Sequence, residues 1–277
     1  TKTNGMAQAK PAQQAKQGGG FKLPSGLIIL VAFIASELIF HFIFGSESNF
    51  VKPDKVTPLE GNYQGVIYHG GFVVPFLMTM FMTVVAFSIE RFLTIRKASG
   101  NGNLADFLKV LKTNLNSGNI DAAISACDKQ KGSVANVVQS GLHKYKEMQN
   151  NTTLTTEQKV LNISKEIEES TTLELPILQR NLSILATLAS VSTLIALFGT
   201  VLGMIRAFAA LATAGTPDPG KLATGISEAL INTAIGIFTS AIAIISYNYF
   251  TGKIDDLTFS IDEMGFSITQ TFAANNN

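Results

Sequence analysis

The sequence predicts an all-α, polytopic membrane helical protein whose long helices extend from the membrane into the cytoplasm. Four apolar runs predict the membrane fold, because each is long enough to cross a bilayer as a helix, which takes about 20 residues. The region between the second and third runs carries apolar residues at helical spacing, and strand-like alternation is convincing nowhere. The four runs are 23–45, 65–92, 182–211 and 222–250.

The first half of the chain divides into a tail, two spans and a polar region. Residues 1–22 are rich in Gln, Ala, Gly and Lys and predict a disordered basic tail. Residues 23–45 are either a secretory signal or a retained transmembrane helix; we favour the helix, because no A-x-A cleavage site follows. A polar loop leads to the second span at 65–92. The mostly polar region 93–180 predicts a cytoplasmic helical stalk.

The second half predicts a transmembrane hairpin at 182–250. Its two arms are separated by the breaker cluster Gly-Thr-Pro-Asp-Pro-Gly at 215–220. Before Leu182 the only strong break is Pro176, so we expect the third helix to run well into the cytoplasm. Residues 251–277 predict a short C-terminal amphipathic segment.

Orientation follows from the basic residues that flank the spans. Twelve Lys and Arg residues lie in the stretch 91–180 and four in the tail, but only two in the loop 46–64 and one in the turn 213–221. Loops rich in Lys and Arg stay on the cytoplasmic side. Both termini and the stalk are therefore expected in the cytoplasm, with membrane lipid around the four spans.

Composition argues against several classes of protein. The formal net charge is +1, which gives no bulk attraction to nucleic acid. Cys127 is the single cysteine and is interpreted as a buried structural thiol, and the three histidines are scattered, so we expect no metal site. The sequence has no Gly-rich phosphate loop and no nucleophile elbow. We therefore expect no enzyme and no cofactor.

Polar residues at membrane depth are the strongest functional signal. Thr200 and Thr233 lie almost equally far from the predicted turn, roughly 25 Å along each helix, so an antiparallel hairpin brings them to one level. Arg206 and Glu228 form a second level, where Arg206 is a possible charge partner. Either threonine could simply bond its own backbone. Glu228 could form a structural ion pair or belong to an ion path.

Small residues on the two helices predict close packing. Gly199 and Gly203 have G-x-x-x-G spacing on the first helix, and Gly225 and Gly236 belong to a small-residue stripe on the second. Such stripes let helix backbones approach each other in membranes. The pattern is common, and packing alone would explain each glycine.

Two motifs resemble the MotA/TolQ/ExbB proton-channel family, with its ExbB branch as the nearest resemblance. The stretch LIALFGTVLGMIRAF at 194–208 resembles the family pattern LxGLLGTVxGMIxAF, and GISEALINTAIG at 225–236 resembles GISEALxxTAxG. Tyr247-Asn248 matches a closing Y-N, and Glu90-Arg91 matches an E-R pair. The resemblance covers roughly residues 66–262 and is most specific over 194–248.

The resemblance implies a ring, a homopentamer in this family, in the bacterial inner membrane. Thr200, Thr233 and Glu228 would line the pore and the ion path. The proton-binding Asp would belong to an ExbD-like single-span partner, which fits the lack of Asp in the four spans. The motor would energise outer-membrane transport through a TonB-like protein.

The chain departs from the family pattern at three places. Family prolines fall at Thr193 and Ile242, and the loss of both argues against a flagellar motor subunit. The span at 23–45 is additional to the usual three. The alternatives are a TolQ-like or gliding-type motor subunit, or a passive membrane scaffold.

Overall fold

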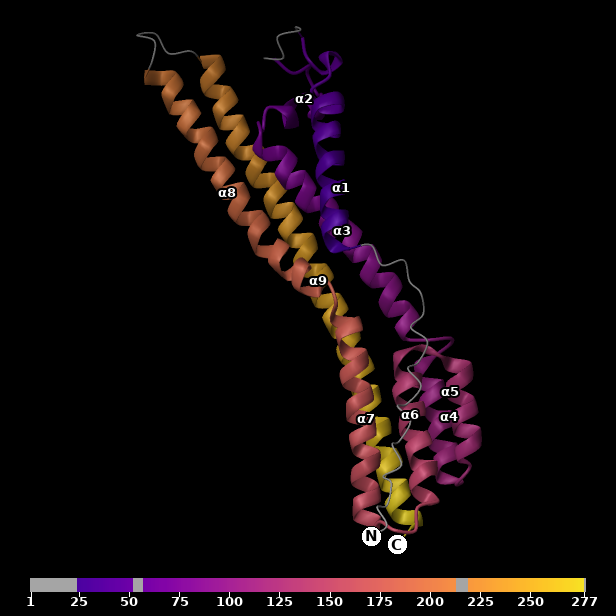
Figure 1. Ribbon diagram of the computed structural model, residues 1–277. Coiled ribbons are helices and arrows are strands. Elements are labelled where there is room, and N and C mark those ends of the chain that lie inside the picture. The colour runs from indigo at the N-terminus through magenta and orange to yellow at the C-terminus, as the bar shows by residue number, and fades with distance from the viewer. Residues whose placement is uncertain (1–23, 52–56, 213–218, 277) are drawn as a thin grey trace, which may run out of the picture.

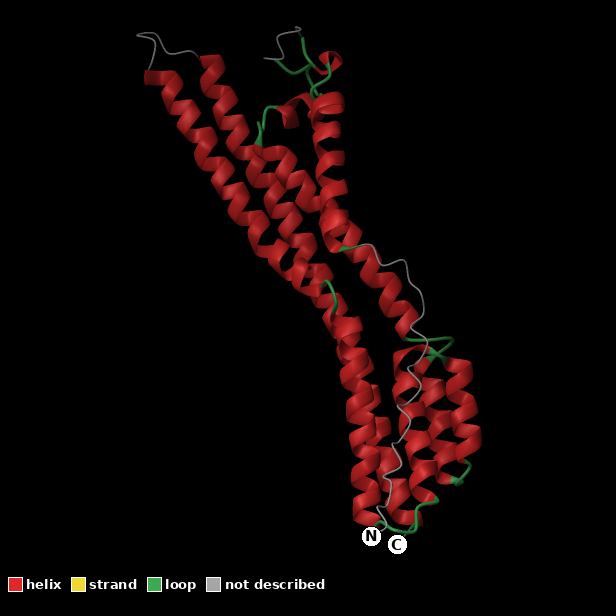
Figure 2. Ribbon diagram, in the orientation of Figure 1, coloured by secondary structure: helices red, strands yellow, loops and turns green. Residues whose placement is uncertain are grey.

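The structure is a computed structural model that describes residues 24–51, 57–212 and 219–276, and it confirms the all-α prediction (Figure 2). Within these residues the only β-type pairing is an isolated bridge between Phe50 and Pro58. The predicted tail at 1–22 and most of the predicted turn at 215–220 lie outside the described residues.

Nine α-helices and two short helical turns make up the described chain. They are α1 (Ser25–Leu38) with a π-helical turn (Ile39–Phe44), a 3₁₀ turn (Glu47–Asn49), α2 (Tyr63–Tyr68), α3 (Val73–Ala98), α4 (Leu104–Asn116), α5 (Ile120–Gln130), α6 (Gly132–Gln149), α7 (Thr156–Gln179), α8 (Leu182–Ala212) and α9 (Pro219–Asn275).

The helices form two bodies that are connected by the long helices α3, α7–α8 and α9 (Figure 1). In the upper body, α8 and the first half of α9 run side by side as a hairpin, with α1 and α3 beside them. In the lower body, α4, α5 and α6 pack with α7 and the second half of α9. The hairpin is thereby connected directly to the lower body through both of its arms.

Four of these helical segments are long and apolar enough to span a membrane. They are Ser25–Phe44, Val73–Ala98, part of Thr156–Ala212 and part of Pro219–Asn275. Many of their large apolar side chains are exposed, as expected for surfaces that face lipid or another membrane helix. The protein is therefore a multi-pass membrane protein.

The second predicted span is shorter than the apolar run at 65–92. The chain bends between α2 and α3 at residues 69–72, where Gly71 has a φ of +73°. Glycine takes this left-handed conformation at no steric cost. The membrane helix therefore begins at Val73, and residues 69–72 form a link that packs against α9.

The third predicted helix is interrupted, and the break is not at Pro176. The helix breaks between α7 and α8, where Arg180 is extended and Asn181 has a φ of +63°. Pro176, which the sequence suggested as the only strong break, lies inside α7. By contrast, α9 continues through the predicted C-terminal segment without interruption to Asn275.

The lower body has a conventional hydrophobic core. Asn103, Asn119 and Thr155 cap the first turns of α4, α5 and α7 with side-chain hydrogen bonds. The second half of α9 buries apolar side chains at helical spacing against these helices. The Phe272 and Tyr145 rings meet edge to face, with 4.8 Å between their centres. This core holds the lower ends of α7 and α9 together.

Candidate functional site

The two membrane threonines meet across the hairpin. Thr200 Oγ1 and Thr233 Oγ1 form a hydrogen bond between α8 and α9. Thr200 Oγ1 also lies 3.0 Å from the carbonyl oxygen of Ala196 and 3.3 Å from that of Ala229, and Thr233 Oγ1 lies 3.0 Å from the Ala229 oxygen. Both side chains are half-buried.

This arrangement offers more acceptors than donors. Each hydroxyl has one proton to donate and two lone pairs, so two protons serve four short contacts. A hydroxyl that turns from a carbonyl toward its neighbour exchanges one hydrogen bond for another. The pair can therefore accept a hydrogen bond from a third group, such as a carboxylic acid or water, without leaving a polar atom unsatisfied.

Glycines allow the helices to approach closely enough for this contact. A methyl group at Gly225 would lie 2.7 Å from the backbone nitrogen of Ala207, and one at Gly203 would lie 2.7 Å from that of Ala229. Gly199 lies against the side chain of Asn232, and Gly236 lies against Ala196. These four positions run along the α8–α9 contact on both sides of the threonine pair.

Nearer the C-terminal end of α8, Arg206 and Glu228 form an ion pair. The Arg206 guanidinium lies 2.6 Å from Glu228 Oε1 and 5.7 Å from the centre of the Phe72 ring. Only 4% of the Glu228 side chain is exposed, against 52% for Arg206. A buried carboxylate requires such a partner. Within a single chain, Glu228 is therefore enclosed rather than open.

The link between α2 and α3 covers this ion pair. A methyl group at Gly71 would lie 2.5 Å from Glu228 Oε1. Asn232, which is fully buried one turn beyond Glu228, donates a hydrogen bond to the Gly70 carbonyl at 3.0 Å. Sequence reasoning missed the link, because 65–92 reads as one apolar run. The Gly70-Gly71 pair was the signal that could have found it.

The other candidate groups lie apart from this site. Cys127 is buried in the lower body and shares no site with the hairpin. Within the described ranges no three His, Cys, Asp or Glu side chains gather as a metal-binding group.

Comparison with known proteins confirms the family resemblance. Residues 129–263 match the model of the MotA/TolQ/ExbB proton channel family. This range contains the threonine pair, the ion pair and the four glycines.

Three relatives illustrate the similarity. The Tol-Pal system protein TolQ of Pseudomonas aeruginosa is 44% identical over 80 residues, which are 29% of this chain and 35% of that protein. The biopolymer transport protein ExbB of Salmonella typhimurium is 33% identical over 84 residues, 30% of this chain and 34% of that protein. ExbB of Pseudomonas putida is 38% identical over 79 residues, 27% of this chain and 24% of that protein. The chain thus matches about a third of the length of the first two relatives.

Proposed function

Because residues 129–263 match the model of the MotA/TolQ/ExbB proton channel family, we propose that the protein is a subunit of a membrane motor driven by the proton-motive force. In the finer form of the proposal it is ExbB-like and resides in the bacterial inner membrane. It works with an ExbD-like partner and a TonB-like protein to energise outer-membrane transport. The match to proteins named ExbB supports this form.

The Thr200–Thr233 pair carries the proposal. It places two hydroxyls that can exchange donor and acceptor roles side by side within a membrane hairpin, next to exposed apolar side chains. A protonated carboxyl group on a partner helix could hydrogen-bond to this pair and release its proton farther along the path. One charge that crosses 100 mV yields about 2.3 kcal/mol, which is enough to bias a conformational step.

A ring of several copies would surround such a partner. Leu197, Phe198 and Val201 flank Thr200 on α8 and are exposed in the single chain, as is Leu230 near Thr233 on α9. Exposed apolar faces suit lipid or helix contacts within a membrane. We propose a homopentamer in which the α8 and α9 faces with the threonines surround a central conduit, with Glu228 and Arg206 nearer its outer end.

A TolQ-like role is the second candidate. It is favoured by the 44% identity to the Tol-Pal protein of Pseudomonas aeruginosa. Both candidates use the same hydroxyl pair and differ in the partners. Purification of the tagged chain from its native membrane, followed by identification of the bound single-span proteins, separates the two.

A passive scaffold is the rival from another class. It requires only the glycine contacts between α8 and α9, and it assigns no role to the hydroxyls. The isosteric substitutions Thr200→Val and Thr233→Val distinguish the two readings, because they remove the hydroxyls and preserve the shape.

We expect each valine variant to assemble with its partners but to lose at least nine-tenths of energised transport, measured in cells that lack the native copy. Thr239→Val is the matched control. Thr239 is fully buried on α9, and its hydroxyl donates to the Ile235 carbonyl of its own helix at 2.8 Å. Full transport by Thr200→Val and Thr233→Val would contradict the motor proposal and favour the scaffold.

A further inference from the structure

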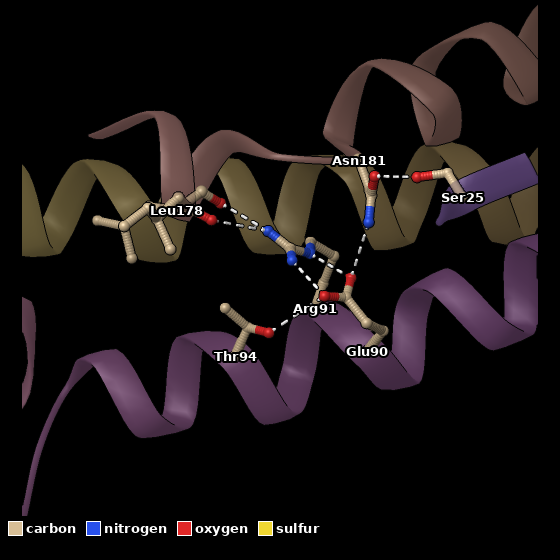
Figure 3. Close-up of polar contacts among 7 residues, drawn as sticks. Ser25, Glu90, Arg91, Thr94, Leu178 and Asn181 are labelled. Atoms are coloured by element: carbon tan, nitrogen blue, oxygen red, sulfur yellow. Dashed lines mark hydrogen bonds and ion pairs between the residues drawn. The ribbon is translucent and has the colours of Figure 1, made fainter. Parts of the chain in front are cut away.

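A second polar cluster lies at the junction of α7 and α8 (Figure 3). It joins Glu90, Arg91 and Thr94 of α3 to the break between α7 and α8. It also reaches Ser25, the first residue of α1. In the sequence, Glu90 and Arg91 lie at the end of the predicted span 65–92 and match the family's E-R pair, but no role was assigned to them.

Arg91 is the centre of the cluster. Its side chain is 1% exposed, and burial of a guanidinium requires compensation from charges and hydrogen bonds. Its Nε donates to Glu90 Oε2 at 2.7 Å, and Nη2 pairs with Glu90 Oε1. Its Nη1 donates to the carbonyls of Ile177 and Leu178 at 3.2 and 3.1 Å.

Those two carbonyls are the ones that an unbroken helix would use itself. In a continuous α-helix, each carbonyl accepts from the N–H four residues ahead. The partners of Ile177 and Leu178 would be the N–H groups of Asn181 and Leu182. Because α7 ends at Gln179, these carbonyls are left for Arg91, which also suits the negative end of the helix dipole. At the break, Arg91 therefore supplies the hydrogen bonds that a straight α7–α8 helix would give to these two carbonyls.

Asn181 completes the connection at the break. It takes the left-handed conformation, which Asn tolerates better than most residues. Its Nδ2 donates to Glu90 Oε2 at 3.3 Å, and its Oδ1 accepts from Ser25 Oγ at 2.9 Å. Figure 3 shows a continuous series of contacts from Leu178 of α7 to Ser25 of α1. It runs through the side chains of Arg91, Glu90 and Asn181.

We propose that Arg91 and Asn181 are positioning residues that hold the bend between α7 and α8. They thereby set the direction in which α8 carries Thr200 into the membrane. The break lies 19 residues before Thr200, about 28 Å along the helix, so a small change of angle at the bend becomes a large displacement of the hydroxyl. This inference rests on the proposed function of the hydroxyl pair. It extends that function to a site in the stalk boundary.

The test measures the distance between two labels across the break and the proton flux through the complex. Nitroxide labels at Glu169→Cys and Thr187→Cys, two exposed positions on either side of the break, report the bend in a Cys127→Ser background. Proton flux is measured on the co-purified complex in proteoliposomes. The variants are Arg91→Gln and Asn181→Gly, and the latter keeps the left-handed backbone accessible if Arg91→Gln fails to fold. Arg96→Gln, an exposed position on α3, is the matched loss of charge.

We expect Arg91→Gln and Asn181→Gly to broaden the distance distribution and to lower proton flux at least tenfold, with Arg96→Gln like the unmodified chain. An unchanged distribution in both variants would overturn the positioning role. So would a broadened distribution with undiminished flux, because the bend would then be structural only. A lack of flux in the unmodified complex would overturn the proposed function instead, and the distance measurement would still report whether these residues hold the bend.

Discussion

At the residue scale, the two members of the Arg206–Glu228 ion pair are not equivalent. Glu228 is almost fully buried, whereas half of the Arg206 side chain is exposed. Removal of Arg206 leaves a buried carboxylate that has lost its charged partner. Removal of Glu228 leaves a cation that can extend toward the membrane surface.

We therefore expect Arg206→Gln to destabilise the protein by about 2 kcal/mol more than Glu228→Gln does, because uncompensated burial of a charge dominates the difference. Thermal unfolding of the two variants in detergent measures this difference. Equal losses, or a larger loss for Glu228→Gln, would show that the environment of Glu228 is wetter than its burial indicates.

The ion path is tested by a different variant. Glu228→Ala should impair energised transport if Glu228 belongs to that path.

The buried Cys127 thiol predicts how the stability of the protein depends on pH. Burial, with a smaller contribution from the neighbouring charge of Asp128, raises the pKa of the Cys127 thiol from 9.0 to about 12. The folded state therefore disfavours the thiolate, which the unfolded state forms freely above pH 9. Stability that depends on this thiol is complete below pH 9 and is lost as the pH rises from 9 toward 12.

Comparison of Cys127→Ala with the unmodified chain isolates this effect. The unmodified chain should lose stability more steeply between pH 9 and 12, and its thiol should resist maleimide at pH 8 until the protein unfolds. Parallel stability curves, together with rapid labelling at pH 8, would show that the thiol is accessible.

At the element scale, the α8–α9 crossing depends on glycine. A methyl group at Gly225 meets the Ala207 nitrogen at 2.7 Å and the Gly203 carbonyl at 2.8 Å, both of them backbone atoms that cannot rotate away. Gly252 lies on the same helix and has open space around its Cβ position. The two positions form a matched pair.

Gly225→Ala should destabilise the hairpin by about 1–3 kcal/mol through overpacking. Gly252→Ala should be neutral or stabilising by up to about 1 kcal/mol, because Ala favours a helix more than Gly does. Thermal unfolding in detergent compares them. A harmless Gly225→Ala would mean that the two backbones are not held in close contact.

The sequence predicted the helices better than their interruptions. Long apolar runs mark the spans because lipid leaves few alternatives, and equal spacing from the turn placed Thr200 and Thr233 at one level. The break at Asn181 was not predictable from local pattern. It is held by Glu90 and Ser25, which are 91 and 156 residues away along the chain. The Gly70-Gly71 bend lay hidden within an otherwise apolar run.

At the scale of the whole molecule, the two arms of the hairpin reach the lower body by different routes. The arm α8 is bent at a polar joint, whereas α9 runs without interruption for 57 residues. One bent connection and one straight-through connection would let the lower body set the position of the two membrane helices without separating them. This arrangement suits a subunit that surrounds a moving partner, as the proposed function requires.

The most direct test of the account is an experimental structure of the assembled complex in lipid. The account predicts several copies around one axis, with the Thr200 and Thr233 hydroxyls directed at a central conduit that holds a single-span partner. Hydroxyls that face lipid, or a single subunit without a conduit, would contradict it.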